Sequence, residues 1–172
     1  MRVAPEPEMK ISIDAMTRAD WPEVRRIYLE GVATREATFE TDAPDFASWD
    51  ADHIESPRLA ARAAGLRRLV GWAALSQVSK RPVYTGVAEV SVYVSADSRG
   101  RGVGRSLLEA LVKASEEAGF WTLQAGIFPE NAASIRLHEK CGFRLVGLHE
   151  KLGVHYGVWR DVLLFERRSR TL

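Results

Sequence analysis

A glycine cluster constrains the fold of this chain more than any other stretch of its sequence. Gly100, Gly102 and Gly104 occupy alternate positions in SRGRGVGRSLLEALV, residues 98–112. Glycine inside regular structure costs about 0.5–1 kcal/mol relative to alanine, so the cluster indicates unusual backbone angles or the close approach of another molecule. EVSVYV before it is typical of a strand, and the leucines after it recur at helical spacing. A strand, a glycine turn and a helix predict an anion site, because the first amides of the helix lack internal partners.

Two better-known glycine loops do not match this one. A P-loop requires lysine and then serine or threonine after its last glycine, whereas Arg105 and Ser106 follow Gly104. The dinucleotide fingerprint G-x-G-x-x-G requires glycine where Arg105 stands. The sequence instead fits Arg-x-x-Gly-x-Gly at Arg99, Gly102 and Gly104. We therefore expect the backbone amides of this turn, with a neighbouring arginine, to hold a phosphate group.

The remaining sequence predicts strands and helices in the order βααββαβαββ. The expected elements are a strand at 10–16, a helix at 17–34, a partly helical segment at 43–64, a hairpin of strands at 68–78 and 87–95, a helix from the glycines to 118, a strand at 120–128, a helix at 131–143 and two strands within 144–167. This order predicts an α+β or mixed α/β fold, with strand-to-helix turns at 95–104 and 128–131.

Composition limits the class of protein and its partners. A chain of 172 residues fits a single domain, expected at 9–168, with a disordered lead-in at 1–8 and a solvated tail at 169–172. The 24 basic and 23 acidic residues nearly balance, which argues against a nucleic-acid binder. Cys141, the single cysteine, excludes an internal disulfide and a cysteine-rich metal site, and we expect no metal. The sequence contains no run of 18 apolar residues and no signal segment, so we expect a cytoplasmic protein without membrane contact.

The segments around the glycine turn resemble one enzyme superfamily. Arg-x-x-Gly-x-Gly resembles the pyrophosphate loop of the GCN5-related N-acetyltransferases (GNAT), and FPENAASIRLHEKCGFRLVG resembles the second half of their fold. With EVSVYV and GVWRDVLLFER, these segments resemble the phosphinothricin acetyltransferase family over residues 9–168, and GFWTL, IFPENAAS and GVWRDV resemble its arsinothricin-acetylating branch. The resemblance implies acetyl-CoA as co-substrate. It implies as acceptor the α-amine of a small, toxic amino acid such as phosphinothricin, arsinothricin or methionine sulfoximine, to which acetylation would confer resistance. It also implies the GNAT fold, a central, mostly antiparallel twisted sheet that is splayed at the cofactor site and flanked by helices.

Acetyl transfer to an amine requires a base, a donor for the oxyanion and a proton for the departing thiolate. Glu89 lies in a strand apolar enough to be central, so its carboxylate needs either a partner, such as a nearby arginine, or a catalytic purpose. The resemblance places the general base there. His138 is the second catalytic candidate, because many relatives carry a proton-donating tyrosine in this context. A histidine of the core or of the helix surface is the alternative.

The resemblance also implies which residues bind the cofactor. In the superfamily a bulge splays the strand after the base and frees backbone amides for the thioester carbonyl, and an asparagine with the helix after it contacts the pantetheine arm. The expected cofactor-binding residues are Ser91, Val92, Tyr93, Val94, Arg99, Gly100, Arg101, Gly102, Val103, Gly104, Arg105, Ser106, Asn131 and Ser134.

Substrate contacts carry a weaker signal. The family often has an aromatic residue and arginines between the hairpin strands, where this sequence has Val78 and Ser79 beside two cations. Lysine and arginine pair readily with the carboxylate and the phosphinate or arsinate of phosphinothricin or arsinothricin. The sequence suggests no cluster of carboxylates around Glu89, which disfavours a long peptide or a polycation as substrate. The expected substrate-binding residues are Lys80, Arg81, Tyr84, His155, which replaces the family's usual lysine, and Tyr156.

The sequence also leads to a prediction of the number of subunits and leaves two alternatives to amino-acid acetylation open. Five tryptophans and the resemblance together predict a homodimer. One alternative function is acetylation of an N-terminal or other peptide amine. The other is a CoA-binding module without catalysis, against which the retention of Glu89 argues.

Overall fold

The sheet and four helices make up most of the chain. The computed structural model describes residues 9–65 and 67–172, so the lead-in expected at 1–8 lies outside the described residues. The helices are α1 (Trp21–Ala33), α2 (Phe46–Asp52), α3 (Val103–Glu117) and α4 (Ala132–Lys140), and the strands are β1 (Ile11–Ala15), β2 (Arg58–Ala63), β3 (Leu69–Gln77), β4 (Val87–Val94), β5 (Thr122–Ile127), β6 (Arg144–His155) and β7 (Val158–Arg168). None of the helices in these ranges is long and apolar enough to cross a membrane.

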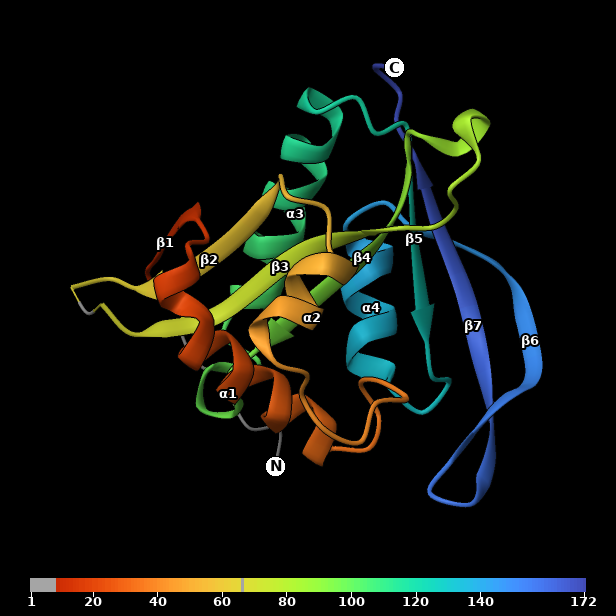
Figure 1. Ribbon diagram of the computed structural model, residues 1–172, viewed down its shortest axis with the longest axis horizontal. Coiled ribbons are helices and arrows are strands. Elements are labelled where there is room, and N and C mark those ends of the chain that lie inside the picture. Colours follow the sequence, from red (N-terminus) through yellow and green to blue (C-terminus); the bar gives the residue numbers. More distant parts are fainter. Residues whose placement is uncertain (1–8, 66) are drawn as a thin grey trace, which may run out of the picture.

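The strands form one twisted sheet in the order β1-β2-β3-β4-β5-β7-β6 (Figure 1). All neighbours are antiparallel except β4 and β5, which are parallel and pair only over Val87–Glu89 and Thr122–Gln124. Beyond Glu89 the two strands diverge. The β3–β4 register runs from Gly71–Val94 to Gln77–Ala88 without a shift, so divergence of β4 from β5, not a bulge in the β3–β4 ladder, splays the sheet.

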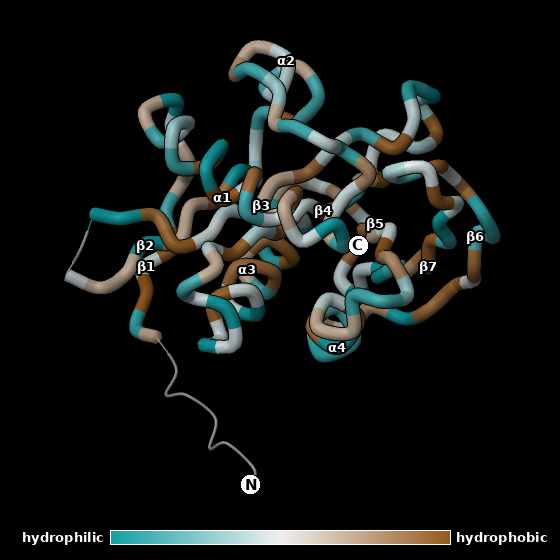
Figure 2. The backbone as a smooth tube through the Cα atoms, turned by 90° about the horizontal axis from the view of Figure 1, so that it is seen from below, coloured by the Kyte–Doolittle hydropathy of each residue, from teal (hydrophilic) through white to brown (hydrophobic). Residues whose placement is uncertain are grey.

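The helices cover both faces of the sheet. Figure 2 shows α1 and α2 on one face and α3 and α4 on the other. Leu107, Leu108 and Leu111 of α3 are fully buried, and their helical spacing places them against β2, β3 and β4. On the opposite face Trp49 of α2 packs with Trp72 of β3 in a separate cluster. The two cores hold rigid the strands from which the cleft described below is built.

The observed elements differ from the prediction at two places. The second half of the segment expected to be partly helical is strand β2, in which Ala60 and Ala61 are completely buried between β1 and β3. Pairing on both edges outweighs the helical preference of alanine. Ser169, expected in the solvated tail, is buried, and its N–H donates to the Trp121 carbonyl at 2.8 Å.

Candidate active site

A cleft of about 1330 Å³ opens where β4 and β5 diverge. Its walls come from α1, the connection between α1 and α2, β4, the glycine turn and α4. The predicted site residues that line it are Glu89, Ser91, Val92, Tyr93, Val94, Arg99, Gly100, Gly102, Gly104, Arg105, Asn131, Ser134 and His138. Of the predicted cofactor residues, Arg101, Val103 and Ser106 do not line it. Val103 is buried in the α3 core, because the helix begins there.

The glycines of the turn are required for two different reasons, backbone conformation and space in the cleft. Gly100 and Gly102 have φ angles of 75° and 84°, which L residues with a side chain rarely adopt, and Gly102 is the N-cap of α3. Gly104 has no such backbone requirement. A Cβ there would lie 3.4 Å from side-chain atoms of Val94 and Leu137, which is ordinary contact. The fold therefore requires glycine at 100 and 102, whereas Gly104 keeps the cleft wide between β4 and α4.

The open edge of β4 presents backbone groups to the cleft. Ser95 N–H donates to the Val70 carbonyl at 2.9 Å, and N–H groups alternate in direction along an antiparallel strand. The amides of Val92 and Val94 therefore face away from β3, toward the gap. In agreement, the carbonyl of Val94 accepts a hydrogen bond from Arg99 Nε at 3.2 Å on that side. Of the four strand residues predicted to bind the cofactor, Ser91–Val94, only Val92 and Val94 direct their N–H groups toward the gap.

Glu89 occupies the point where the strands separate. It pairs with Ser76 of β3 and Gln124 of β5, and its side chain is accessible from the cleft. Within the described residues no hydrogen bond or ion pair to its carboxylate is found, so the alternative of a structural arginine partner is not realised. Displacement of bulk water by the surrounding protein raises the pKa of the Glu89 carboxyl. An unpaired carboxylate with a raised pKa in a cleft is suited to accept a proton.

His138 is held in one neutral form. Its Nδ1 lies 2.8 Å from the Ser134 carbonyl, which can only accept, so Nδ1 carries the proton and Nε2 is an acceptor. Burial lowers the pKa of His138. The ring is 5% exposed, contacts Phe143 edge to face and lines the cleft. This arrangement favours accepting a hydrogen bond at Nε2 over the expected donation of a proton to a thiolate.

Asn131 ties two walls of the cleft together. Its Oδ1 accepts from Ser134 N–H at 3.1 Å and caps α4, and its Nδ2 donates to the Glu36 carbonyl at 3.2 Å. Glu36 belongs to the α1–α2 connection, which lines the opposite side. The Asn131 side chain therefore fixes the geometry of the cleft mouth.

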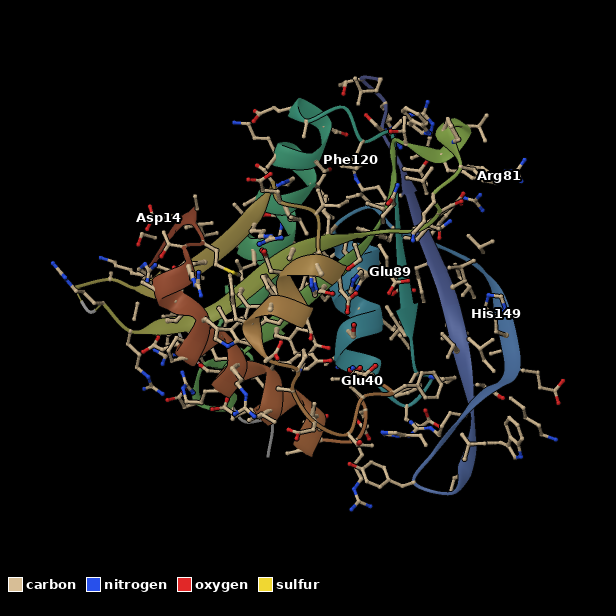
Figure 3. All side chains as sticks on the ribbon, viewed as in Figure 1. Asp14, Glu40, Arg81, Glu89, Phe120 and His149 are labelled. Atoms are coloured by element: carbon tan, nitrogen blue, oxygen red, sulfur yellow. The ribbon has the colours of Figure 1, made fainter. Side chains whose placement is uncertain are left out.

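Three predicted substrate residues lie elsewhere. Lys80, Arg81 and Tyr84 belong to the β3–β4 connection and do not line the cleft. Figure 3 shows Arg81 at the periphery and Glu89 near the centre of the molecule. The expectation relied on nearness in sequence, but an extended strand rises about 3.3 Å per residue and carries the connection away from the base.

The predicted pair at the β6–β7 turn lies beside the cleft and not on its surface. His155 is 3% exposed and packs between the rings of Phe39 and Phe128, which do line the cleft. Burial and then the charge of Arg160 lower the pKa of His155. Tyr156 is exposed, and the guanidinium of Arg35 lies 4.2 Å from its ring centre.

Sequence reasoning missed the wall opposite α4. The aromatic residues Tyr28, Trp49, His53 and Trp72 line it. It also carries the carboxylates Glu36, Glu40, Asp42 and Asp52. Folding of α2 and the α1–α2 connection over the sheet therefore brings four carboxylates into the same cleft as Glu89, from positions about 40 to 50 residues away in the sequence, which the sequence did not suggest. The spacing of Trp49 and His53 by one helical turn was the available signal.

Comparison with known proteins assigns the family. Residues 21–143 match the model of the Acetyltransferase (GNAT) family. The chain belongs to this family. As a GNAT acetyltransferase it is similar to a phosphinothricin N-acetyltransferase of Alcaligenes faecalis, with 34% identity over 86% of this chain and 77% of that protein. An L-methionine sulfoximine/L-methionine sulfone acetyltransferase of Pseudomonas paraeruginosa is 32% identical over 92% of this chain and 94% of that protein.

A solved structure agrees with this assignment. The phosphinothricin acetyltransferase of Sinorhizobium meliloti, in complex with AcCoA, has a TM-score of 0.83 and 29% identity, covering 93% of this chain and 89% of that chain. The predicted family, fold and N-acetyltransferase class are confirmed. Among the described residues of this GNAT acetyltransferase, no group of three or more His, Cys, Asp or Glu side chains could hold a metal ion.

Proposed function

We propose that this protein transfers the acetyl group of acetyl-CoA to the α-amine of a small amino-acid-like compound, with Glu89 as general base. The observation that carries the proposal is the unpaired Glu89 carboxylate at the divergence of β4 and β5, in the same cleft as the glycine turn. Both relatives described above act, by their names, on compounds of this kind. A cytoplasmic location, which fits a reaction that consumes acetyl-CoA, belongs to the proposal.

The cofactor would lie along the open edge of β4. The amides at the start of α3, with Arg99 and Arg105 beside them, are suited to the diphosphate, because helix N-termini favour anions. The pantetheine arm would pass between β4 and α4, where Gly104 leaves space. His138 Nε2 would accept a hydrogen bond from one of its amides. The AcCoA complex of the Sinorhizobium meliloti relative supports acetyl-CoA as the co-substrate.

The reaction follows from these positions. Glu89, directly or through a water molecule, removes a proton from the substrate ammonium, and the free amine attacks the thioester carbonyl. The amide of Val92 donates to the oxyanion that forms. When the C–S bond breaks, the tetrahedral nitrogen, now positively charged, supplies the proton that the thiolate takes up. The products are the N-acetyl compound and CoA, and Glu89 returns its proton to solvent.

The proposed acceptors carry a compact tetrahedral head: phosphinothricin, methionine sulfoximine or arsinothricin. Acetylation of the α-amine would inactivate such a toxic amino acid and confer resistance to it. The family relatives support the first two compounds as a class. The four carboxylates of the α1–α2 side favour a second candidate, acetylation of a peptide amine on a cationic segment.

A homodimer is part of the proposal. Strand β6 ends the sheet, so one of its edges has no partner strand among the described residues. Exposed apolar side chains on β6 and β7 support burial against a second copy. They are Leu145, Val146, Leu148, Leu152, Val154, Val158 and Trp159. Light scattering should give about twice 19.2 kDa; a mass near 19.2 kDa at all concentrations would contradict the dimer.

Labelled acetyl-CoA and a panel of acceptors test the proposed function. The panel contains phosphinothricin, arsinothricin, methionine sulfoximine, glutamate and a lysine-rich peptide with a free N-terminus. We expect kcat/KM for at least one tetrahedral amino acid to exceed that for glutamate and for the peptide at least tenfold. Faster acetylation of the peptide would establish the second candidate. Binding of acetyl-CoA without any transfer would indicate a non-catalytic module.

A further inference from the structure

Charge is divided unequally between the two sides of the cleft. The lining residues between 28 and 53 include four carboxylates, Glu36, Glu40, Asp42 and Asp52, and no lysine or arginine. The lining arginines and lysine, Arg99, Arg105, Arg136 and Lys140, all belong to the segment 99–140 on the cofactor side. Glu40 belongs to the connection between α1 and α2. One of the four, Asp42, is paired with Arg25 at 3.8 Å, so an acceptor whose side chain rests against residues 28–53 meets neutral groups and three carboxylates that form no ion pair with a described residue.

His53 is a neutral polar group of that wall, beside Tyr28 and three threonines. Its Nδ1 lies 2.7 Å from the Trp49 carbonyl, which can only accept, so Nδ1 carries the proton and Nε2 offers a lone pair. Nε2 makes no hydrogen bond to any described residue and is not among the buried atoms, so it is accessible in the cleft. Burial lowers the pKa of His53, which keeps the ring uncharged at neutral pH.

The His53 ring is fixed in place. It stacks on Trp49 with ring centres 4.2 Å apart, and Arg58 donates to the His53 carbonyl at 2.8 Å. The next residue, Ile54, donates its N–H to the Leu75 carbonyl at 2.8 Å. Leu75 precedes Ser76, which pairs with Glu89 across the β3–β4 ladder and lines the same cleft. His53 and Glu89 thus line the same cleft from connected elements, and in the arrangement proposed below the acceptor's amine lies at Glu89 and its side chain points toward His53.

We propose that His53 recognises the acceptor's side chain. Its Nε2 accepts a hydrogen bond from an uncharged head group that bears an N–H or O–H donor. The carboxylates among the lining residues 28–53 select against anionic head groups. This inference rests on the proposed function and specifies the substrate class of that same site. Three compounds of nearly equal shape separate the possibilities. Phosphinothricin carries an anionic phosphinate, methionine sulfone carries acceptors only, and methionine sulfoximine carries an N–H donor.

The experiment measures kcat/KM for these three acceptors with the full-length protein, because ratios of kcat/KM report discrimination directly. We expect sulfoximine to exceed phosphinothricin at least tenfold. His53→Phe keeps a ring against Trp49 but removes the lone pair, and should lower kcat/KM for sulfoximine at least fivefold while changing that for sulfone less than twofold. His53→Gln, whose amide oxygen can accept, should recover part of the loss. His149→Phe, on β6 at the periphery in Figure 3, is the matched control and should change none of the values.

The possible results separate two failures. A sulfoximine-to-phosphinothricin ratio below tenfold, or an equal loss for all three acceptors in His53→Phe, overturns the inference and leaves the proposed function standing. If the wild-type protein acetylates no amino acid, the proposed function itself fails. If His53→Phe does not fold, His53→Ala, which also removes the lone pair, takes its place. A loss of kcat/KM that is at least fivefold larger for sulfoximine than for sulfone in His53→Ala supports acceptance by the side chain, and an equal effect on both compounds overturns it.

Discussion

Gly104→Ala separates the requirements of the fold from those of the cofactor. The added Cβ would lie 3.4 Å from Val94 and Leu137 side-chain atoms, which is ordinary contact, and position 104 has no positive φ. Alanine is the better helix former, so the substitution near the start of α3 should stabilise the protein by about 0.5 kcal/mol. For a domain of this size that corresponds to a rise in Tm of roughly 1–2 °C. The same methyl group narrows the space through which the pantetheine would pass.

Acetyl-CoA affinity should move in the opposite direction. We expect Kd to rise at least tenfold, which corresponds to about 1.4 kcal/mol of binding free energy. Isothermal titration calorimetry gives Kd, and urea or thermal unfolding gives stability on the same samples. Lys113→Ala, on the exposed face of α3, is the control and should leave Kd unchanged. A Kd within twofold of wild type in a folded Gly104→Ala protein would refute the close-approach argument.

Three further predictions concern the walls of the cleft. Glu89→Gln should raise Tm at pH 7, since the raised folded-state pKa means that ionisation of the carboxyl destabilises the fold; thermal scans should show the gain fading as pH falls through the raised pKa toward the ordinary Glu value of 4.5, with no further change below it. Asn131→Ala should cost about 1 kcal/mol in urea unfolding through loss of the α4 cap to Ser134, and a variant as stable as wild type would disprove that role. His138→Phe should raise KM for acetyl-CoA more than it lowers kcat, because Nε2 serves as an acceptor; steady-state kinetics showing a selective fall in kcat would instead restore the proton-donor role.

Short sequence patterns predicted the elements whose structure depends mainly on their own residues. The glycine turn predicted the start of α3. The β-branched and aromatic residues of two segments, with a turn-like segment between them, predicted β3 and β4 as a hairpin. Strand β2 was missed because RLAARA combines alanines with arginines, a composition typical of helices. Its extended form depends on pairing with β1 and β3, which no local window contains.

Part of the candidate site could be predicted from single strands. Glu89 could be selected as a candidate because a carboxylate in a central strand needs either a partner or a purpose, whereas its role as general base came from the family resemblance and is a proposal. The cleft wall formed by residues 28–53 could not be predicted, since His53 reaches the cleft only because α2 and the α1–α2 connection fold over the sheet. The tautomer of His138 could not be predicted from the sequence either, because it depends on the distance between Nδ1 and the Ser134 carbonyl. Lys80 and Arg81 show the converse error, in which nearness in sequence was taken for nearness in space.

The pH dependence of kcat/KM for wild type and Glu89→Gln, measured with methionine sulfoximine and saturating acetyl-CoA, tests the central claim most directly. Because the pKa of Glu89 is raised, wild-type activity should fall on the acid side with a midpoint above the ordinary Glu value of 4.5. Glutamine keeps the shape of the side chain and removes its basicity, so activity at neutral pH should fall roughly 10²–10⁴-fold and this acid limb should disappear. A loss below about threefold, with the acid limb of the profile unchanged, would show that Glu89 is not the base.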